Sequence, residues 1–191
     1  MLVLGSDRMK KLLLITGDIA AGKTTFSNKL SDRYKAVVFQ KDTVKEILGD
    51  HIGFQNRAEN KKLSVATMNI LYHIFSNIAK TGSSIILESN FHEAEQEVLH
   101  AIANENGYQV LTLVLRGNTD VLYHRYLHRM NEENRHPVHL STTLHIQSDF
   151  SKIAEQIRTG KIIGEAIEIN ATDFSYQDDE ALFAKIDEFM N

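Results

Sequence analysis

Residues 17–24 read Gly17-Asp18-Ile19-Ala20-Ala21-Gly22-Lys23-Thr24, and this stretch decides the fold. It has the spacing G-x-x-x-x-G-K-[ST] of a phosphate-binding loop. The apolar residues 12–15 before it predict a buried strand, and residues 25–30 after it predict a helix. Because such a loop joins a strand to a helix, its context argues against a chance glycine turn. A dinucleotide-binding fold is disfavoured, since the spacing G-x-G-x-x-G is absent.

The chemistry of the loop explains its residue types. Glycines let backbone N–H groups turn toward phosphate oxygens, and the helix that starts near Gly22 adds the positive end of its dipole. We expect Lys23 to reach the β- and γ-phosphates and the Thr24 hydroxyl to ligate Mg²⁺. The residues expected to bind the nucleotide here are Gly17, Asp18, Ala20, Ala21, Gly22, Lys23, Thr24 and Thr25.

The composition predicts a single globular domain over residues 1–191, with 42% hydrophobic and 24% charged residues. A net charge of −4 argues against a generally basic nucleic-acid binder, although a local basic groove stays open. The absence of cysteine suits a reducing cytosol, so we expect a cytoplasmic protein. No apolar run approaches the ~20 residues of a membrane span. Residues 1–8 lack the order of a signal peptide, and Met9 is an alternative start.

Apolar segments alternate with amphipathic ones along the chain. The expected strands are 11–16, 36–40, 84–88, 110–115 and 162–169, and the expected helices are 24–32, 43–48, 61–80, 94–106, 119–130 and 178–190. This alternation predicts a parallel sheet with helices on both faces. Ligands bind such sheets beyond the carboxyl ends of the strands, so functional residues are expected there.

Asp42 follows the second expected strand. It could accept a proton from an acceptor hydroxyl or hold that hydroxyl in line with the γ-phosphate. The alternative is that Asp42 caps the next helix, where aspartate is favoured. Beside the phosphate-binding loop, the catalytic interpretation is the stronger one. Lys45, three residues on, is expected to contact the acceptor.

Glu88 ends the third expected strand, where enzymes with this loop often carry an acidic residue that acts on Mg²⁺. Glu88 is therefore a candidate for the metal or for the acceptor, and the alternative is a surface carboxylate at a strand end. Asn90 is a weaker candidate for contact with the acceptor.

Several arginines follow the fourth expected strand. Arg125 and Arg129 are four residues apart and share a helix face, and Arg135 comes after the polar residues 131–134. The region 118–140 is predicted to be a helical lid whose arginines neutralise a transferring phosphoryl group. The alternative is a solvated face paired with Glu132 and Glu133.

The histidines of this region do not predict a zinc site, since His124 and His128 have no third ligand at useful spacing. Contact of His136 or His139 with substrate is the better interpretation. The loop after the fifth strand contains Thr172 and is expected to lie near the adenine. The alternative there is an ordinary turn rich in Asn and Asp.

Four segments together resemble the small P-loop kinases: GDIAAGKTT, QKDTVKE, IILESNF and YHRYLHRMNEENRHPVH. More narrowly, they are similar to the AAA-type ATP-binding kinase-like proteins near polynucleotide kinase, zeta toxin and chloramphenicol phosphotransferase. The resemblance runs from about Lys10 to the C-terminus. It implies a five-stranded parallel sheet in the order 2-3-1-4-5, with ATP and Mg²⁺ as cofactors.

The resemblance also implies site residues. It places the base at Asp42 and the lid arginines at Arg125, Arg129 and Arg135. Many relatives have Arg where this chain has Lys45, and an aspartate is often found where Glu88 stands.

The leading functional hypothesis is an ATP-dependent kinase that phosphorylates a hydroxyl of a small molecule. The catalytic residues in this hypothesis are Lys23, Asp42, Arg129 and Arg135, with Arg125 and Thr172 on the nucleotide. Alternatives are a polynucleotide 5′-hydroxyl kinase, a toxin that phosphorylates a nucleotide sugar, and an ATP-binding regulator without an acceptor. The sequence identifies neither the acceptor nor the oligomeric state.

Overall fold

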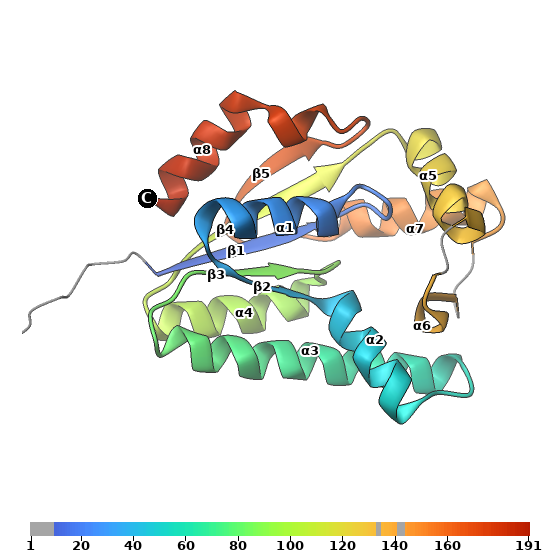
Figure 1. The fold of residues 1–191 in the computed structure, drawn as a ribbon, viewed down its shortest axis with the longest axis horizontal. Coiled ribbons are helices and arrows are strands. Elements are labelled where there is room, and N and C mark those ends of the chain that lie inside the picture. Colours follow the sequence, from blue (N-terminus) through green and yellow to red (C-terminus); the bar gives the residue numbers. More distant parts are fainter. Residues whose placement is uncertain (1–9, 133–134, 141–143) are drawn as a thin grey trace, which may run out of the picture.

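The computed structural model describes residues 10–132, 135–140 and 144–191. Met9 and residues 133–134 of the expected lid lie outside the described residues. The described chain forms one five-stranded sheet in the order β2-β3-β1-β4-β5 with every pair parallel (Figure 1). The predicted fold class and strand order are therefore confirmed.

The elements occur in the alternation that the sequence predicts. The strands are β1 Lys11–Gly17, β2 Val37–Gln40, β3 Ile85–Glu88, β4 Gln109–Arg116 and β5 Glu165–Asn170. The α-helices are α1 Lys23–Tyr34, α2 Lys41–Ile52, α3 Arg57–Ala79, α4 Glu93–Glu105, α5 Thr119–Glu132, α6 Pro137–Leu140, α7 Gln147–Thr159 and α8 Glu180–Met190, and a short 3-10 helix spans Ser175–Asp178.

The inner strands β1 and β3 are buried on both faces of the sheet. Leu13 and Ile15 of β1 belong to an apolar cluster with α1 and α8, whereas Leu12 and Leu14 belong to a second cluster with α3 and α4. Figure 1 shows these two helix layers on opposite sides of the sheet. A strand that is buried on both faces needs a continuous apolar run, which is why this pattern is recognisable in the sequence.

Several details differ from the prediction. The last strand begins at Glu165 rather than at residue 162, and α2 spans Lys41–Ile52 rather than 43–48. Helices α6 and α7 are not among the predicted helices. Helix α7 carries apolar Phe150, Ile153 and Ile157 at helical spacing, and this pattern in the sequence indicates a helix. Phe150 is fully buried and packs against Tyr123 and Tyr126 of α5, so α7 supports α5.

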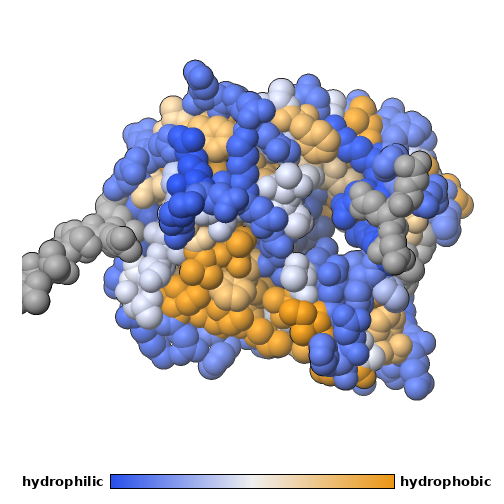
Figure 2. Space-filling view, in the orientation of Figure 1, coloured by the Kyte–Doolittle hydropathy of each residue, from blue (hydrophilic) through white to orange (hydrophobic). Residues whose placement is uncertain are grey.

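The edge of the sheet at β2 is partly apolar at the surface. Figure 2 shows an apolar area between α1 and α3, where the edge strand β2 lies and where Val37 is 45% exposed. In the described part of the chain, no helix is long and apolar enough to cross a membrane.

Candidate active site

The loop between β1 and α1 has the backbone geometry of a tight phosphate-binding turn. Gly17 has φ +125°, and a Cβ there would lie 2.0 Å from the carbonyl oxygen of Leu115. Gly22, at the N-cap of α1, has φ +85°, and a Cβ there would lie 2.7 Å from the Tyr176 hydroxyl. Both glycines are therefore required by left-handed backbone and by close neighbours. No side chain caps α1 among the described residues, so its first N–H groups stay available to an anion.

Lys23 spans this loop. Its Nζ donates hydrogen bonds to the carbonyl oxygens of Asp18 at 2.7 Å and of Gly17 at 3.1 Å. Burial lowers the pKa of Lys23, and the nearby carboxylates, Glu88 foremost, oppose that shift. An incoming phosphate would supply further negative charge next to this half-buried cation.

Thr24 and Glu88 lie side by side although they are 64 residues apart. The Thr24 hydroxyl donates to the Glu88 carboxylate at 3.1 Å, and Glu88 is only 5% exposed. Burial raises the pKa of Glu88, and the Lys23 ammonium acts in the opposite direction. The next residues, Ser89 and Asn90, each carry a buried side-chain oxygen that has no hydrogen-bond partner among the described residues. These oxygens belong to residues of the cavity wall, where a ligand could reach them.

Asp42 lies in the first turn of α2 and is exposed on the same cavity. The N-cap of α2 is Gln40, so Asp42 is not the residue that caps this helix. Lys45 donates to the Asn60 side-chain oxygen at 2.7 Å, and the Asn60 amide donates to the carbonyl of Val138 at 2.8 Å. Burial lowers the pKa of Lys45, while Asp42 opposes the shift.

The arginines of α5 divide between two places. Arg125 donates to the carbonyls of Ala171 at 2.8 Å and Thr172 at 2.6 Å, and its guanidinium lies 4.1 Å from the Phe174 ring centroid. Arg129 lines the cavity and acts electrostatically on both Lys23 and Glu88.

The segment around α6 closes another side of the cavity. Arg135 lines the cavity with its guanidinium 6.0 Å from the Tyr126 ring centroid. His136 pairs with Asp50 at 2.9 Å and His139 pairs with Glu46 at 2.7 Å, so both histidines attach this segment to α2. No group of three or more metal-binding side chains occurs within residues 10–132, 135–140 and 144–191.

One cavity of about 1460 Å³ brings most of the predicted residues together. It opens at the carboxyl ends of the strands, between the α2 side and the α5 side (Figure 2). Its walls include Ala20, Ala21, Gly22, Lys23, Thr24, Thr25, Asp42, Lys45, Glu88, Asn90, Arg125, Arg129 and Arg135.

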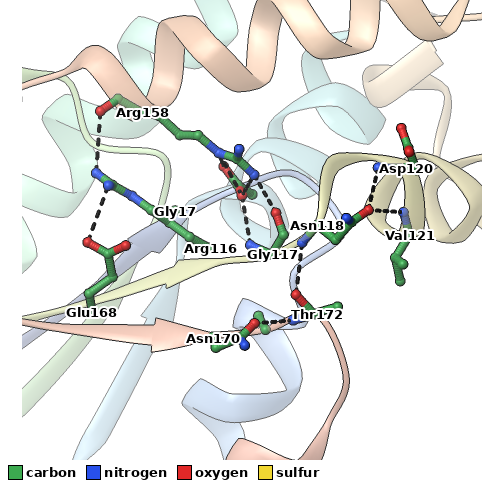
Figure 3. Close-up of polar contacts among 12 residues, drawn as sticks. Gly17, Arg116, Gly117, Asn118, Asp120, Val121, Arg158, Glu168, Asn170 and Thr172 are labelled. Atoms are coloured by element: carbon green, nitrogen blue, oxygen red, sulfur yellow. Dashed lines mark hydrogen bonds and ion pairs between the residues drawn. The ribbon is translucent and has the colours of Figure 1, made fainter.

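Three predicted residues lie outside the cavity wall. Gly17 forms the turn itself, and the Thr172 hydroxyl accepts a hydrogen bond from the backbone N–H of Asn118 at 2.9 Å (Figure 3). The Asp18 side chain is fully buried and bonds to Gly117 and to Arg158 of α7. Arg158 lies on α7, which is not among the predicted helices, and so it is not among the predicted site residues.

The strand order and the phosphate-binding loop define a P-loop fold like that of small kinases. A Chloroflexus aurantiacus protein assigned as a kinase has a TM-score of 0.82 at 24% identity over 96% of this chain and 100% of its own. Shikimate kinase from Bacteroides thetaiotaomicron has a TM-score of 0.57 at 16% identity over 94% and 98%. A chain of the PezAT toxin–antitoxin system of Streptococcus pneumoniae has a TM-score of 0.53 at 14% identity over 88% and 72%. At these identities the structural likeness shows the fold alone.

The chain belongs to the Zeta toxin family, whose model matches residues 4–178. The predicted resemblance to the small P-loop kinases near zeta toxin is thereby confirmed. No protein with a curated description matches the chain. Family and fold together support a P-loop kinase that binds a nucleotide.

Proposed function

We propose that the protein is an ATP-dependent kinase that transfers the γ-phosphoryl group to a hydroxyl of a small molecule. The observation that carries the proposal is the shared cavity, in which the phosphate-binding loop, Asp42 and the arginines Arg129 and Arg135 face one another. Phosphoryl transfer depends mainly on positioning and on electrostatic stabilisation, and these groups supply both.

In this proposal the loop and Lys23 hold the triphosphate. The Lys23 ammonium exchanges the carbonyls of Gly17 and Asp18 for the β- and γ-phosphate oxygens. The Phe174 ring lies beside Gly22 and contacts the Arg125 guanidinium, at the side of the loop where the nucleoside would extend. Thr172 acts through its carbonyl, which holds the Arg125 guanidinium.

The residues present fit Mg²⁺. Thr24 and Glu88 offer two oxygen atoms 3.1 Å apart in the cavity wall, and oxygen is the donor that Mg²⁺ prefers. When bound, Mg²⁺ would neutralise charge on the phosphate oxygens. A cation there would also favour the ionised form of Glu88, whose pKa burial raises.

The acceptor would lie between Asp42 and the γ-phosphate. Asp42 would orient the acceptor hydroxyl and take its proton as the new oxygen–phosphorus bond forms. The bond between the γ-phosphorus and the β,γ-bridging oxygen would break in the same step, with ADP as the leaving group. Lys45 and Asn90 would bind other parts of the acceptor, and Arg129 and Arg135 would stabilise charge on the transferring group.

The test is ATP consumption with Mg²⁺ against a panel of nucleosides, sugars, aminoglycosides, nucleotide sugars and 5′-hydroxyl oligonucleotides. Lys23→Ala is the blank, and Asp42→Asn is expected to bind ATP normally while losing about 10²–10⁴-fold in transfer. An acceptor that stimulates the native protein but not the blank would establish the kinase. Native protein that binds ATP with no acceptor-stimulated turnover would favour a regulator instead.

Membership of the Zeta toxin family favours a second candidate, a toxin-like kinase that phosphorylates a nucleotide sugar. It shares the catalytic groups above and differs in its biology. Growth arrest on expression of the native chain, absent with Lys23→Ala, together with turnover of a nucleotide sugar in the panel, would favour this candidate.

A further inference from the structure

A partly buried ion pair joins the phosphate-binding loop to α7: the carboxylate of Asp18 is fully buried and the side chain of Arg158 is partly exposed. The Asp18 carboxylate has no exposed surface, and it accepts hydrogen bonds from the Gly117 N–H at 3.0 Å and from the Arg158 guanidinium at 2.6 and 3.1 Å. The Arg158 guanidinium also donates to the carbonyl of Gly117 at 2.5 Å. Figure 3 shows Arg158 reaching from α7 over the end of β4 to this point.

Asp18 is itself part of the loop that would bind the triphosphate. Its N–H donates to the carbonyl of Leu115 at 2.8 Å, and its carbonyl accepts the hydrogen bond from Lys23. The loop therefore carries a fixed negative charge close to the place where phosphates would bind. An isolated carboxylate there would repel ATP through a medium that screens charge poorly.

We infer that Arg158 neutralises the Asp18 carboxylate and thereby keeps the phosphate-binding loop attractive to ATP. The inference rests on the proposed function, because it takes ATP as the ligand of this loop. Arg158 does not line the cavity, so it is a positioning residue that acts through Asp18.

A different role for the same contact would be purely structural. Arg158 also ties the end of α7 to β4, since the Arg158 carbonyl accepts a hydrogen bond from Arg116 at 3.3 Å. If the pair only held these elements together, removing either partner would weaken ATP binding. Charge neutralisation instead predicts opposite effects on the affinity for ATP. Loss of Arg158 leaves a negative charge at the loop and weakens ATP binding, whereas loss of the Asp18 charge leaves a positive charge and strengthens it.

The experiment measures the Kd of Mg²⁺–ATP for the native protein, Asp18→Asn, Arg158→Gln and the double variant. We expect Arg158→Gln to raise the Kd about fivefold and Asp18→Asn to lower it by a similar factor. The double variant should return to within about twofold of the native Kd, because charge balance is restored. Changes in the same direction for the two single variants would overturn the inference.

The chain offers a matched control pair. Arg33 and Asp187 form a two-bond ion pair at 3.0 and 2.5 Å between α1 and α8, away from the cavity. Arg33→Gln and Asp187→Asn should leave the Kd for ATP within about twofold of the native value. Control shifts as large as those at Asp18 and Arg158 would also overturn the inference.

Arg158→Gln strands a fully buried carboxylate and is the variant at risk of not folding. Arg158→Lys is then the variant to measure, because lysine keeps the positive charge but cannot bond to Asp18 and Gly117 at the same time. We expect Arg158→Lys to lower the melting temperature while its Kd stays within about twofold of native. A Kd raised as much as in a neutral variant such as Arg158→Met would contradict the inference. Failure of native protein to bind ATP better than Lys23→Ala would instead count against the proposed function.

Discussion

Glu88 is a carboxylate that folding buries and that the proposed reaction needs in its ionised form. Its side chain is held by the Thr24 hydroxyl and lies near the Lys23 ammonium, yet burial dominates and raises its pKa. The ionised form is present above this raised pKa and is lost as the pH falls through it. The acid side of the pH–rate profile should therefore report on Glu88.

We predict that Glu88→Gln lowers Mg²⁺-dependent turnover by about 10–100-fold and removes the acid limb of the kcat/KM profile.

The same change should raise the melting temperature at neutral pH. A raised carboxyl pKa means that the ionised group destabilises the folded state, fully so above that pKa. The gain in melting temperature should disappear at a pH below the ordinary carboxyl pKa, because Glu88 is then protonated in both the folded and the unfolded protein.

The control for this prediction is Glu93→Gln, a change of the same kind at an exposed position of α4. It should leave both the profile and the melting temperature near native. An acid limb that survives in Glu88→Gln would assign the titration to another group.

Arg125 contributes to the proposed nucleotide site through geometry that lysine cannot reproduce. Its guanidinium donates to two carbonyls at once and lies 4.1 Å from the Phe174 ring centroid. We predict that Arg125→Lys raises the KM for ATP about tenfold and changes kcat by less than about threefold. Initial rates at saturating acceptor give both numbers, and an unchanged KM for ATP would remove Arg125 from the nucleotide site.

At the scale of whole elements, Asn60 joins three helices at the acceptor side of the cavity. It lies on α3, it accepts from Lys45 of α2, and it donates to the backbone of α6 at Val138. Asn60 is only 5% exposed, so removing its amide strands buried polar partners.

We predict that Asn60→Ala raises the KM for the acceptor about tenfold, because Lys45 and α6 lose a common anchor. The Kd for ATP should change by less than about twofold, since the loop and Arg125 do not touch Asn60. Asn69→Ala is the matched control on the same helix, where the exposed Asn69 donates to the carbonyl of Val65 one turn earlier. Equal effects on ATP and acceptor would mean that Asn60 supports the fold in general.

Local patterns identify β1, α1 and the strand-end residues Asp42 and Glu88, because periodicity and the loop motif act over a few neighbouring residues. Helix α7 has the same kind of signal in Phe150 and Ile153 and could have been predicted.

The side-chain contacts of Asp18 could not be predicted from local patterns. Its partner Arg158 is 140 residues away, and the residues next to Asp18 or Arg158 in the sequence do not specify the pairing. The P-loop motif predicts that Asp18 belongs to the nucleotide site, but the direction of its side chain depends on where β4 and α7 end. Thr172 is a similar case, because its hydroxyl is used by Asn118 of a neighbouring loop.

For the whole molecule, nucleotide binding should raise thermal stability. The proposed ATP site joins the loop after β1, the end of β3, α5 and the loop after β5, so a bound nucleotide would hold much of the sheet together. We predict that Mg²⁺–ATP at about one hundred times its Kd stabilises the fold by about 2.7 kcal/mol, or about 5–10 °C in Tm.

Differential scanning fluorimetry tests this prediction, with Lys23→Ala as the control. The variant should show less than about a quarter of the native shift at the same ATP concentration. A shift of native size in Lys23→Ala would place ATP somewhere other than the phosphate-binding loop.

The residues proposed to bind the acceptor and those proposed to bind ATP come from different stretches of the chain. Strand β2 is at the edge of the sheet, and β2, α2 and α3 follow one another without interruption between α1 and β3. That stretch supplies the cavity residues Asp42, Lys45, Asn60 and Ser64, whereas the phosphate-binding loop and Arg125 come from elsewhere. An edge strand with its two helices can be exchanged without threading through the sheet. The segment from β2 to α3 would then behave as a cassette for acceptor specificity. Recombination between relatives could replace this segment and leave the residues that bind ATP unchanged.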